Sequence, residues 1–102
     1  MKMNRMTNVC VKILRVTDAS SYPLWVDCVL TDYHGNDHMF HGKLPWFSVQ
    51  EIISPPCEGE MRCIVEGDTE DSVSIDISEP DALESIEGET KFVVKRDQIK
   101  DN

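Results

Sequence analysis

The chain has 102 residues, 40% hydrophobic and 28% charged, which suits one domain with a single modest core. No apolar run is long enough for a membrane helix or a secretory signal, so we expect a cytoplasmic protein without membrane contact. The net charge of −9 argues against binding nucleic acid, which requires a positive surface. A basic protein is a permitted partner, although excess acid also simply keeps a protein soluble.

Alternation of apolar and polar residues with a period of two is the main pattern in the chain, and it predicts β-strands. Valine and isoleucine, which favour strands, dominate the first of these stretches. A polar turn joins the last two stretches, so they form a predicted hairpin. The expected strands span residues 8–16, 24–31, 37–44, 60–66 and 72–78.

The sequence DYHG at residues 32–35 suits a type I turn followed by a glycine bulge. Such a turn makes residues face each other when their numbers sum to 68, as Asp32 and Asn36 do. On the predicted core side the pairs are Cys28–Phe40, Leu30–His38 and Val26–Gly42. On the other side they are Asp27–His41, Val29–Met39 and Trp25–Lys43, the last a predicted cation–π contact.

All three histidines lie between residues 31 and 42, which raises the question of a metal site. His38 and His41 are three apart on a predicted strand and therefore point to opposite faces, while His34 lies in the turn. One ion cannot readily bind all three, so no metal site is expected. The alternative is a dyad of Cys28 and His38 on the core face, although a buried thiol beside a histidine is more often packing.

The four cysteines, at positions 10, 28, 57 and 63, contain no C-x-x-C pair. In a cytoplasmic protein we expect them to be reduced and not to bind a structural metal. The chain also lacks the glycine-rich phosphate-binding motifs and the G-x-S-x-G motif of serine hydrolases. We therefore expect no cofactor and no enzymatic activity.

Two segments leave their local structure open. Ser48, three residues before Glu51, fits a helix capping box, so one or two helical turns are expected at about residues 49–53; an irregular crossover is the alternative. Residues 78–86 are either a helix opened at Ser78 or a hairpin strand. We favour the hairpin, with a turn at Glu87-Gly88 that would pair Leu83 with Phe92 and Glu84 with Lys91.

These elements predict an all-β, mainly antiparallel fold of six or seven short strands with at most one short helix near residues 49–53. A chain of this size protects its sheet edges by curling into a small barrel. We expect residues 1–102 to form a single β-barrel-like domain, with residues 1–7 and 97–102 frayed.

Residues 66–89 carry ten of the nineteen acidic residues and no lysine or arginine. Such a stretch is most often solvated surface, but it also suits the docking of a basic protein. Three aromatic residues at strand ends are further candidate contacts. The candidate partner-binding residues are Trp25, Trp46, Phe47, Glu66, Asp68, Glu70 and Asp71.

Three motifs, T-D-x-x-G at residue 31, H-x-F at residue 38 and E-G-x-T-x-F at residue 87, lie in the stretches LTDYHGNDHMFHGKLP, GEMRCIVE and ESIEGETKFVVKRDQI. From about residue 8 to 99 the chain resembles a widespread family of small bacterial all-β proteins of unknown function. The motifs are turn and strand features, so the resemblance implies a bacterial all-β protein and no site residues.

Two classes of function follow as hypotheses. The first is a non-enzymatic protein-interaction module with an acidic surface, for example an immunity protein or an inhibitor of a basic toxin. The alternative is a small-molecule or metal-binding β-barrel built around Cys28 and His38. A barrel similar to the second domain of translation GTPases is a further alternative, resting on fold analogy alone.

Overall fold

The computed structural model describes residues 5–20 and 22–100 of the chain. Within them the fold is all-β, as predicted, with two short 3-10 turns, η1 (Leu44–Trp46) and η2 (Arg96–Gln98). The described strands are β1 (Arg5–Asp18), β2 (Trp25–Thr31), β3 (Asp37–Lys43), β4 (Cys57–Asp68), β5 (Ser72–Asp76), β6 (Lys91–Lys95) and β7 (Ile99–Lys100). None of the described helices is long and apolar enough to cross a membrane.

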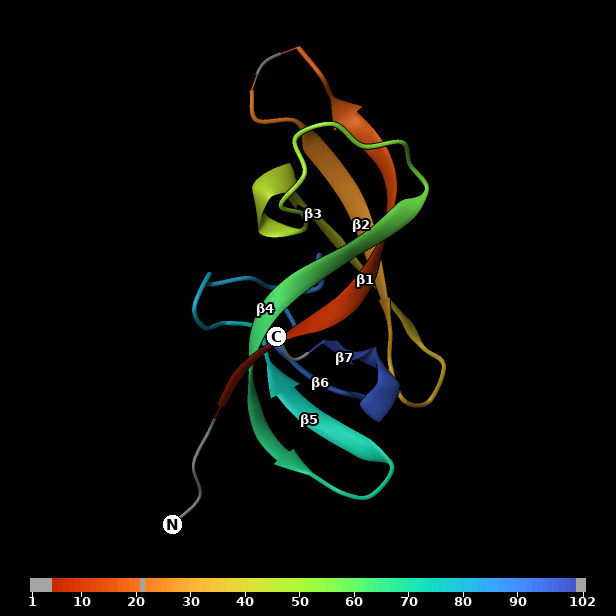
Figure 1. Ribbon diagram of the computed structural model, residues 1–102, viewed down its shortest axis with the longest axis vertical. Coiled ribbons are helices and arrows are strands. Elements are labelled where there is room, and N and C mark those ends of the chain that lie inside the picture. The colour runs from red at the N-terminus through yellow and green to blue at the C-terminus, as the bar shows by residue number, and fades with distance from the viewer. Residues whose placement is uncertain (1–4, 21, 101–102) are drawn as a thin grey trace.

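One antiparallel sheet contains all of these strands, in the order β3-β2-β1-β4-β5-β6, with β7 paired to β1. The long strands β1 and β4 run through the whole sheet, and Figure 1 shows it curling around them into a half-barrel. Register shifts in β1 and between Val65 and Gly67 of β4 mark bulges, which bend a strand and increase its twist. The sheet can therefore wrap around its own core.

The core lies on the inner face of the sheet, where the alternating residues of each strand meet. In β4 and β5 the buried side chains are those expected from the period-two pattern, among them Met61, Cys63, Val73 and Ile75. Burial of a residue of this size contributes about 1.5 to 3 kcal/mol. The full buried apolar set is Val9, Val11, Ile13, Val26, Cys28, Leu30, Phe40, Leu44, Phe47, Met61, Cys63, Val65, Val73, Ile75, Ile77, Leu83, Phe92 and Val94.

The β2–β3 hairpin has the predicted register throughout, from Trp25–Lys43 at one end to Leu30–His38 near the turn. Gly35 has a φ of 85° and donates its N–H to the carbonyl of Asp32 at 3.0 Å, as a glycine-bulge turn requires. The ammonium of Lys43 lies 6.0 Å from the centre of the Trp25 ring, which confirms the cation–π contact. Local turn chemistry is therefore sufficient to set this register.

The helical turns expected at residues 49–53 are absent, and the alternative of an irregular crossover is confirmed. The hydroxyl of Ser48 accepts the N–H of Gln50 at 3.0 Å, so this capping residue closes a local turn instead of starting a helix. The short helical turn in this region is η1, which lies before Ser48 and ends at Trp46. Tertiary contacts of the crossover, described below, override the local helix signal.

The hairpin expected around Glu87-Gly88 is wrong, and residues 78–86 are not helical either. Gly88 does adopt the positive φ of a turn, at 85°, but residues 77–90 form no strand. Phe92 pairs with Ile75 of β5, and Lys91 pairs with Asp76, in place of Leu83 and Glu84. Strand β6 thus pairs with β5, which is more distant in the sequence than residues 83–84, and this pairing extends the main sheet.

Parts of the two expected frayed ends are paired. Residues 5–7 belong to β1, where Arg5 faces Val65 of β4, and residues 99–100 form β7 against β1. Just before β7, the turn η2 is held to the end of β6 by Gln98, whose side-chain oxygen accepts the N–H of Lys95 at 2.8 Å. Residues 1–4 and 101–102, also expected to fray, lie outside the described residues.

The tip of the β2–β3 hairpin reaches across to β6 and partly closes the half-barrel. Tyr33 donates its N–H to the carbonyl of Val93 at 2.7 Å, and Ile86 donates to the carbonyl of Met39 at 2.8 Å. His38 bridges the same gap, with Nε2 2.8 Å from Asp32 and Nδ1 3.1 Å from Glu89. These contacts cover edges that would otherwise remain open for aggregation.

His38 is well placed to be charged. Its side chain is 15% exposed and its ring lies 4.8 Å from that of Phe92. Partial burial lowers the pKa of His38, but the hydrogen bonds to Asp32 and Glu89 outweigh it and raise that pKa above its ordinary value. Burial likewise raises the pKa of Asp32, and its bonds to His38 and to two backbone N–H groups outweigh this, leaving it lowered.

We predict that His38→Gln lowers the free energy of unfolding most strongly in mildly acidic solution. Because the pKa of His38 is raised in the folded state, its stabilising effect is complete below the unfolded-state pKa of about 6.5 and disappears as the pH rises through the folded pKa. The loss near pH 5.5 should be about 1.5 kcal/mol. Urea unfolding at several pH values measures it, with the exposed His34→Gln as control. A loss that is the same at pH 5.5 and 8.5 would contradict the charged bridge.

Candidate functional site

A groove of about 710 Å³ runs along the outer face of β4, between η1 and the loop at Asp81. In Figure 1, η1 and the loop before β6 lie on the same side of β4, one above the other. The floor of the groove consists of outward-facing residues of β1 and β4, and its wall is the start of the crossover between β3 and β4. The lining residues are Asn8, Cys10, Pro45, Trp46, Phe47, Ser48, Val49, Gln50, Glu58, Gly59, Glu60, Arg62, Asp81 and Lys100.

The wall of the groove is fixed to β4 by one close backbone approach. Phe47 accepts the N–H of Glu60 through its carbonyl at 2.9 Å, while its ring is buried in the core. A β-carbon at Gly59 would lie 2.5 Å from the Phe47 carbonyl oxygen and 2.9 Å from Ile13, closer than atoms can approach. Glycine at position 59 is therefore what allows the crossover to cover the edge of β4.

With Phe47 turned inward, the neighbouring apolar side chains are turned outward. Trp46 packs against Gly42, where a β-carbon would meet its ring at 2.6 Å, yet remains 38% exposed. Val49 is fully exposed and Ile52, further along the crossover, is 83% exposed. Three exposed apolar side chains within seven residues form what we call the crossover patch (Trp46, Val49 and Ile52). Exposed apolar clusters of this kind mark interaction sites more often than single exposed residues do.

The charges of the groove are unequally distributed. At one end, near the crossover, the side-chain carboxylates of Glu58 and Glu60 have no hydrogen-bond or ion-pair partner among the described residues. At the other end the guanidinium of Arg62 pairs with Asp81, with Nη2–Oδ1 at 2.5 Å and Nε–Oδ2 at 3.0 Å. Lys100 adds a second cation there without an ion pair to a described residue. The crossover end is thus acidic, and the far end is close to neutral or basic.

Cys10 lies in the floor between these two ends. Burial raises the pKa of the Cys10 thiol; Lys100 lowers it, and the carboxylates of Glu58 and Glu60 raise it further. The thiolate is the nucleophilic form of cysteine, and a raised pKa keeps the thiol protonated near neutral pH. The Cys10 thiol is therefore not activated as a nucleophile by its neighbours in the groove.

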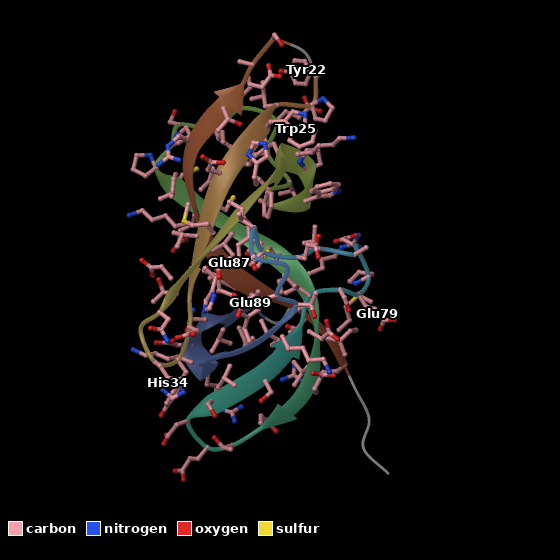
Figure 2. The ribbon with its side chains drawn as sticks, turned by 180° about the vertical axis from the view of Figure 1, so that it is seen from behind. Tyr22, Trp25, His34, Glu79, Glu87 and Glu89 are labelled. Atoms are coloured by element: carbon pink, nitrogen blue, oxygen red, sulfur yellow. The ribbon has the colours of Figure 1, made fainter. Side chains whose placement is uncertain are left out.

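The three candidate aromatics have different environments. Phe47 is almost completely buried, so it supports the groove from the core and cannot contact a partner directly. Trp46 lines the groove, so it stays a candidate contact residue. Trp25, labelled in Figure 2, does not line the groove; the centre of its ring lies 5.3 Å from that of His41, its neighbour on β3.

The four candidate acids lie around the β4–β5 turn, which is near the bottom of Figure 1 and well below η1. Glu66 is 3.5 Å from Lys91, and Asp68 is 3.2 Å from Arg96. Arg96 also donates to the backbone carbonyl of Glu70. The structure therefore separates this acidic set from Trp46 and partly neutralises it with cations from β6 and η2. The predicted residues do not form one site.

Sequence reasoning did not identify three residues that line the groove: Val49, Glu58 and Glu60. The run VQEII after residue 48 contains three apolar residues, but the capping signal at Ser48 favours helical turns there, with an irregular crossover as the alternative. The two glutamates of β4 stand at alternate positions on its outer face, a pattern that the sequence shares with ordinary solvated strands. Only their neighbourhood with the crossover distinguishes them.

The alternative dyad of Cys28 and His38 lacks the required chemistry. Burial raises the pKa of the Cys28 thiol to about 12, with a smaller effect of Asp27, so its thiolate is not formed near neutral pH. Both ring nitrogens of His38 are engaged by carboxylates. The three histidines are separate: His34 lies at the loop tip (Figure 2), and His41 bonds Asp27 at 2.8 Å. Among the described residues no three side chains are grouped to hold a metal ion.

Comparison with known proteins gives no family and no function: no family model, curated protein or solved structure matches the chain. The resemblance to small bacterial all-β proteins stays a prediction. Any functional statement must therefore come from the geometry of the groove itself.

We predict that Gly59→Ala destabilises the protein by about 1 to 3 kcal/mol, because the added methyl group meets the Phe47 carbonyl and Ile13. Urea unfolding followed by Trp fluorescence measures the change. Ser54→Ala, at an exposed position of the same crossover, is the matched control and should change stability by less than about 0.5 kcal/mol. Equal stability of the two variants would refute the role assigned to Gly59.

We also predict that iodoacetamide at pH 7.5 leaves Cys28 unmodified in the folded protein and modifies it after unfolding in urea. Burial and the raised pKa both oppose the thiolate in the native state. Peptide mapping by mass spectrometry identifies the alkylated cysteine. Rapid native labelling of Cys28 would restore the dyad as a candidate site.

Proposed function

We propose that this protein is a non-enzymatic interaction module that binds a protein partner in the groove between η1 and the Asp81 loop. The observation that carries this proposal is the crossover patch beside the groove, with Trp46 and Val49 in the lining itself. Aromatic anchors in a concave, partly preformed site are typical of the residues that dominate binding energy at interfaces. An inhibitor or immunity protein is one concrete form of such a module.

The contacts that hold the start of the crossover patch in place support a binding role, because a loose loop would lack them. Trp46 is seated against Gly42, and Phe47 anchors the next residue both through its ring and through its carbonyl. Trp46 is thus presented from a fixed backbone, and a fixed backbone reduces the entropy that binding would cost. Exposure of Val49 and Ile52 has no benefit for the isolated fold, because apolar side chains gain stability only when buried.

The groove chemistry supports a binding role over catalysis. Its one thiol, that of Cys10, has a raised pKa, and the Arg62–Asp81 pair satisfies both of its own charges. A general base or nucleophile needs a reactive group with an activating neighbour, and these two arrangements supply neither. The remaining lining is suited to contact and charge recognition.

The proposal is tested by selecting random twelve-residue peptides displayed on phage against the wild-type chain. We expect enriched peptides that lose at least tenfold in affinity towards Val49→Asp, because a carboxylate in the patch must be desolvated on contact. Peptide binding should also shift the fluorescence of Trp46.

The matched control is Ile86→Asp, which places the same charge at an exposed apolar position outside the groove lining. It should retain wild-type affinity. If the selection yields no peptide, or if the enriched peptides bind Val49→Asp as well as the wild type, the groove is not a protein-binding site.

A further inference from the structure

The groove also indicates what its partner carries. Resting on the proposed function, we infer that the partner inserts an arginine side chain at the acidic end of the groove, between Glu58 and Glu60 and against Trp46. The chemical class of the occupant is a basic segment whose arginine is flanked by apolar residues.

The two carboxylates have the spacing that such a side chain needs. Glu58 and Glu60 are two residues apart on β4, so they project from the same face, roughly 7 Å apart along the strand. A guanidinium is planar and presents several N–H donors, so it can bond a carboxylate on each side. Lysine, a compact point charge, does not span two acceptors in the same way.

Neither carboxylate is already neutralised within the described chain. Lys12 stands opposite Glu58 in the β1–β4 ladder, but makes no ion pair with it, and Cys10 stands opposite Glu60. The other cations of the groove lie towards its far end, where Arg62 is held by Asp81. An incoming cation would therefore gain its ion pairs at the crossover end without displacing an existing partner.

Trp46 provides the third side of this subsite. Its indole is 38% exposed and lines the same groove, next to the fully exposed Val49. A guanidinium stacks on an indole face and is more weakly hydrated than an ammonium, which makes arginine the favoured cation beside tryptophan. Apolar residues next to the arginine would cover Val49. The whole chain, with a net charge of −9, attracts such a segment from a distance.

Recognition must use side chains, because the open edge of β4 is too short for an added strand. The hydrogen bond from Glu60 to Phe47 divides this edge, and β5 begins to pair at Ile64. The stretches on either side are residues 57–59 and 61–63, each only about 10 Å long. A β-strand partner usually needs a longer continuous edge, since strands average five to six residues.

The test uses two synthetic peptides of identical length with alternating leucine and either arginine or citrulline, the neutral isostere of arginine. Affinity is measured by the change of Trp fluorescence at 50 mM and 300 mM NaCl. We expect the arginine peptide to bind at least tenfold more tightly at low salt, with the difference shrinking at high salt. A lysine peptide should bind more weakly than the arginine peptide.

Charge variants locate the effect. Glu58→Gln with Glu60→Gln should weaken the arginine peptide about tenfold and leave the citrulline peptide unchanged. Glu70→Gln with Asp71→Asn removes the same charge at the other end of the molecule and should change affinity less than about twofold. Lys100→Gln, which removes a competing cation from the groove, should strengthen binding.

The outcomes separate this inference from the proposed function. Equal binding of arginine and citrulline peptides, with both sensitive to Val49→Asp, would overturn the arginine subsite while the groove remains a protein-binding site. Equal losses in the two double variants would also overturn it, because attraction would then come from net charge alone. Binding that is insensitive to Val49→Asp contradicts both proposals.

Discussion

The contact between the Phe47 backbone and Gly59 is the constraint on which the candidate site depends. It occurs where β4 has left its partner β5 and its edge would otherwise be open. A single glycine admits the carbonyl of the crossover, and the hydrogen bond to Glu60 then fixes the chain direction. Phe47 enters the core, while its neighbour Trp46 remains partly exposed. The same contact therefore covers part of a sheet edge and forms the wall of the groove.

The same solution, covering a sheet edge with an irregular segment, recurs on the other side of the half-barrel. The segment between β5 and β6 forms no strand, but Ile86 donates its N–H to β3, and Glu89 reaches His38. At the adjacent hairpin tip, Tyr33 bonds to β6. These links join the two ends of the sheet without a continuous ladder. The sheet thus reduces its exposed edges although it is not a closed barrel.

Sequence reasoning succeeded where the physics is local. The register of the β2–β3 hairpin follows from a turn with Asp32 at its start and Gly35 in the positive-φ position, and each cross-strand pair then follows by counting. The alternation in β5 likewise identified Val73 and Ile75 as core residues. In both cases the residues that decide the structure lie within a few positions of one another, so a short stretch of sequence is enough to predict it.

Sequence reasoning failed where two different strand pairings bury the same residues. Leu83 and Phe92 are both buried, as the rejected hairpin required, but Phe92 obtains its burial by pairing with Ile75. Both pairings present an apolar residue to the core, so composition does not distinguish them. Similarly, Ser48 offered a helix cap, yet the anchoring of Phe47 outweighed it. Nor could local patterns show that two of the seven candidate binding residues, Glu66 and Asp68, form ion pairs with cations from distant parts of the chain.

The sequence by itself determined the all-β class, most strands, the hairpin register and the acidic character of the surface, because period-two patterning and turn residues act over short range. Tertiary structure decided which strand β6 joins, how the crossover runs, and that Glu58, Glu60 and Trp46 share a groove. Those features arise from contacts between segments far apart in the chain, whose cost and gain depend on packing that no local pattern records.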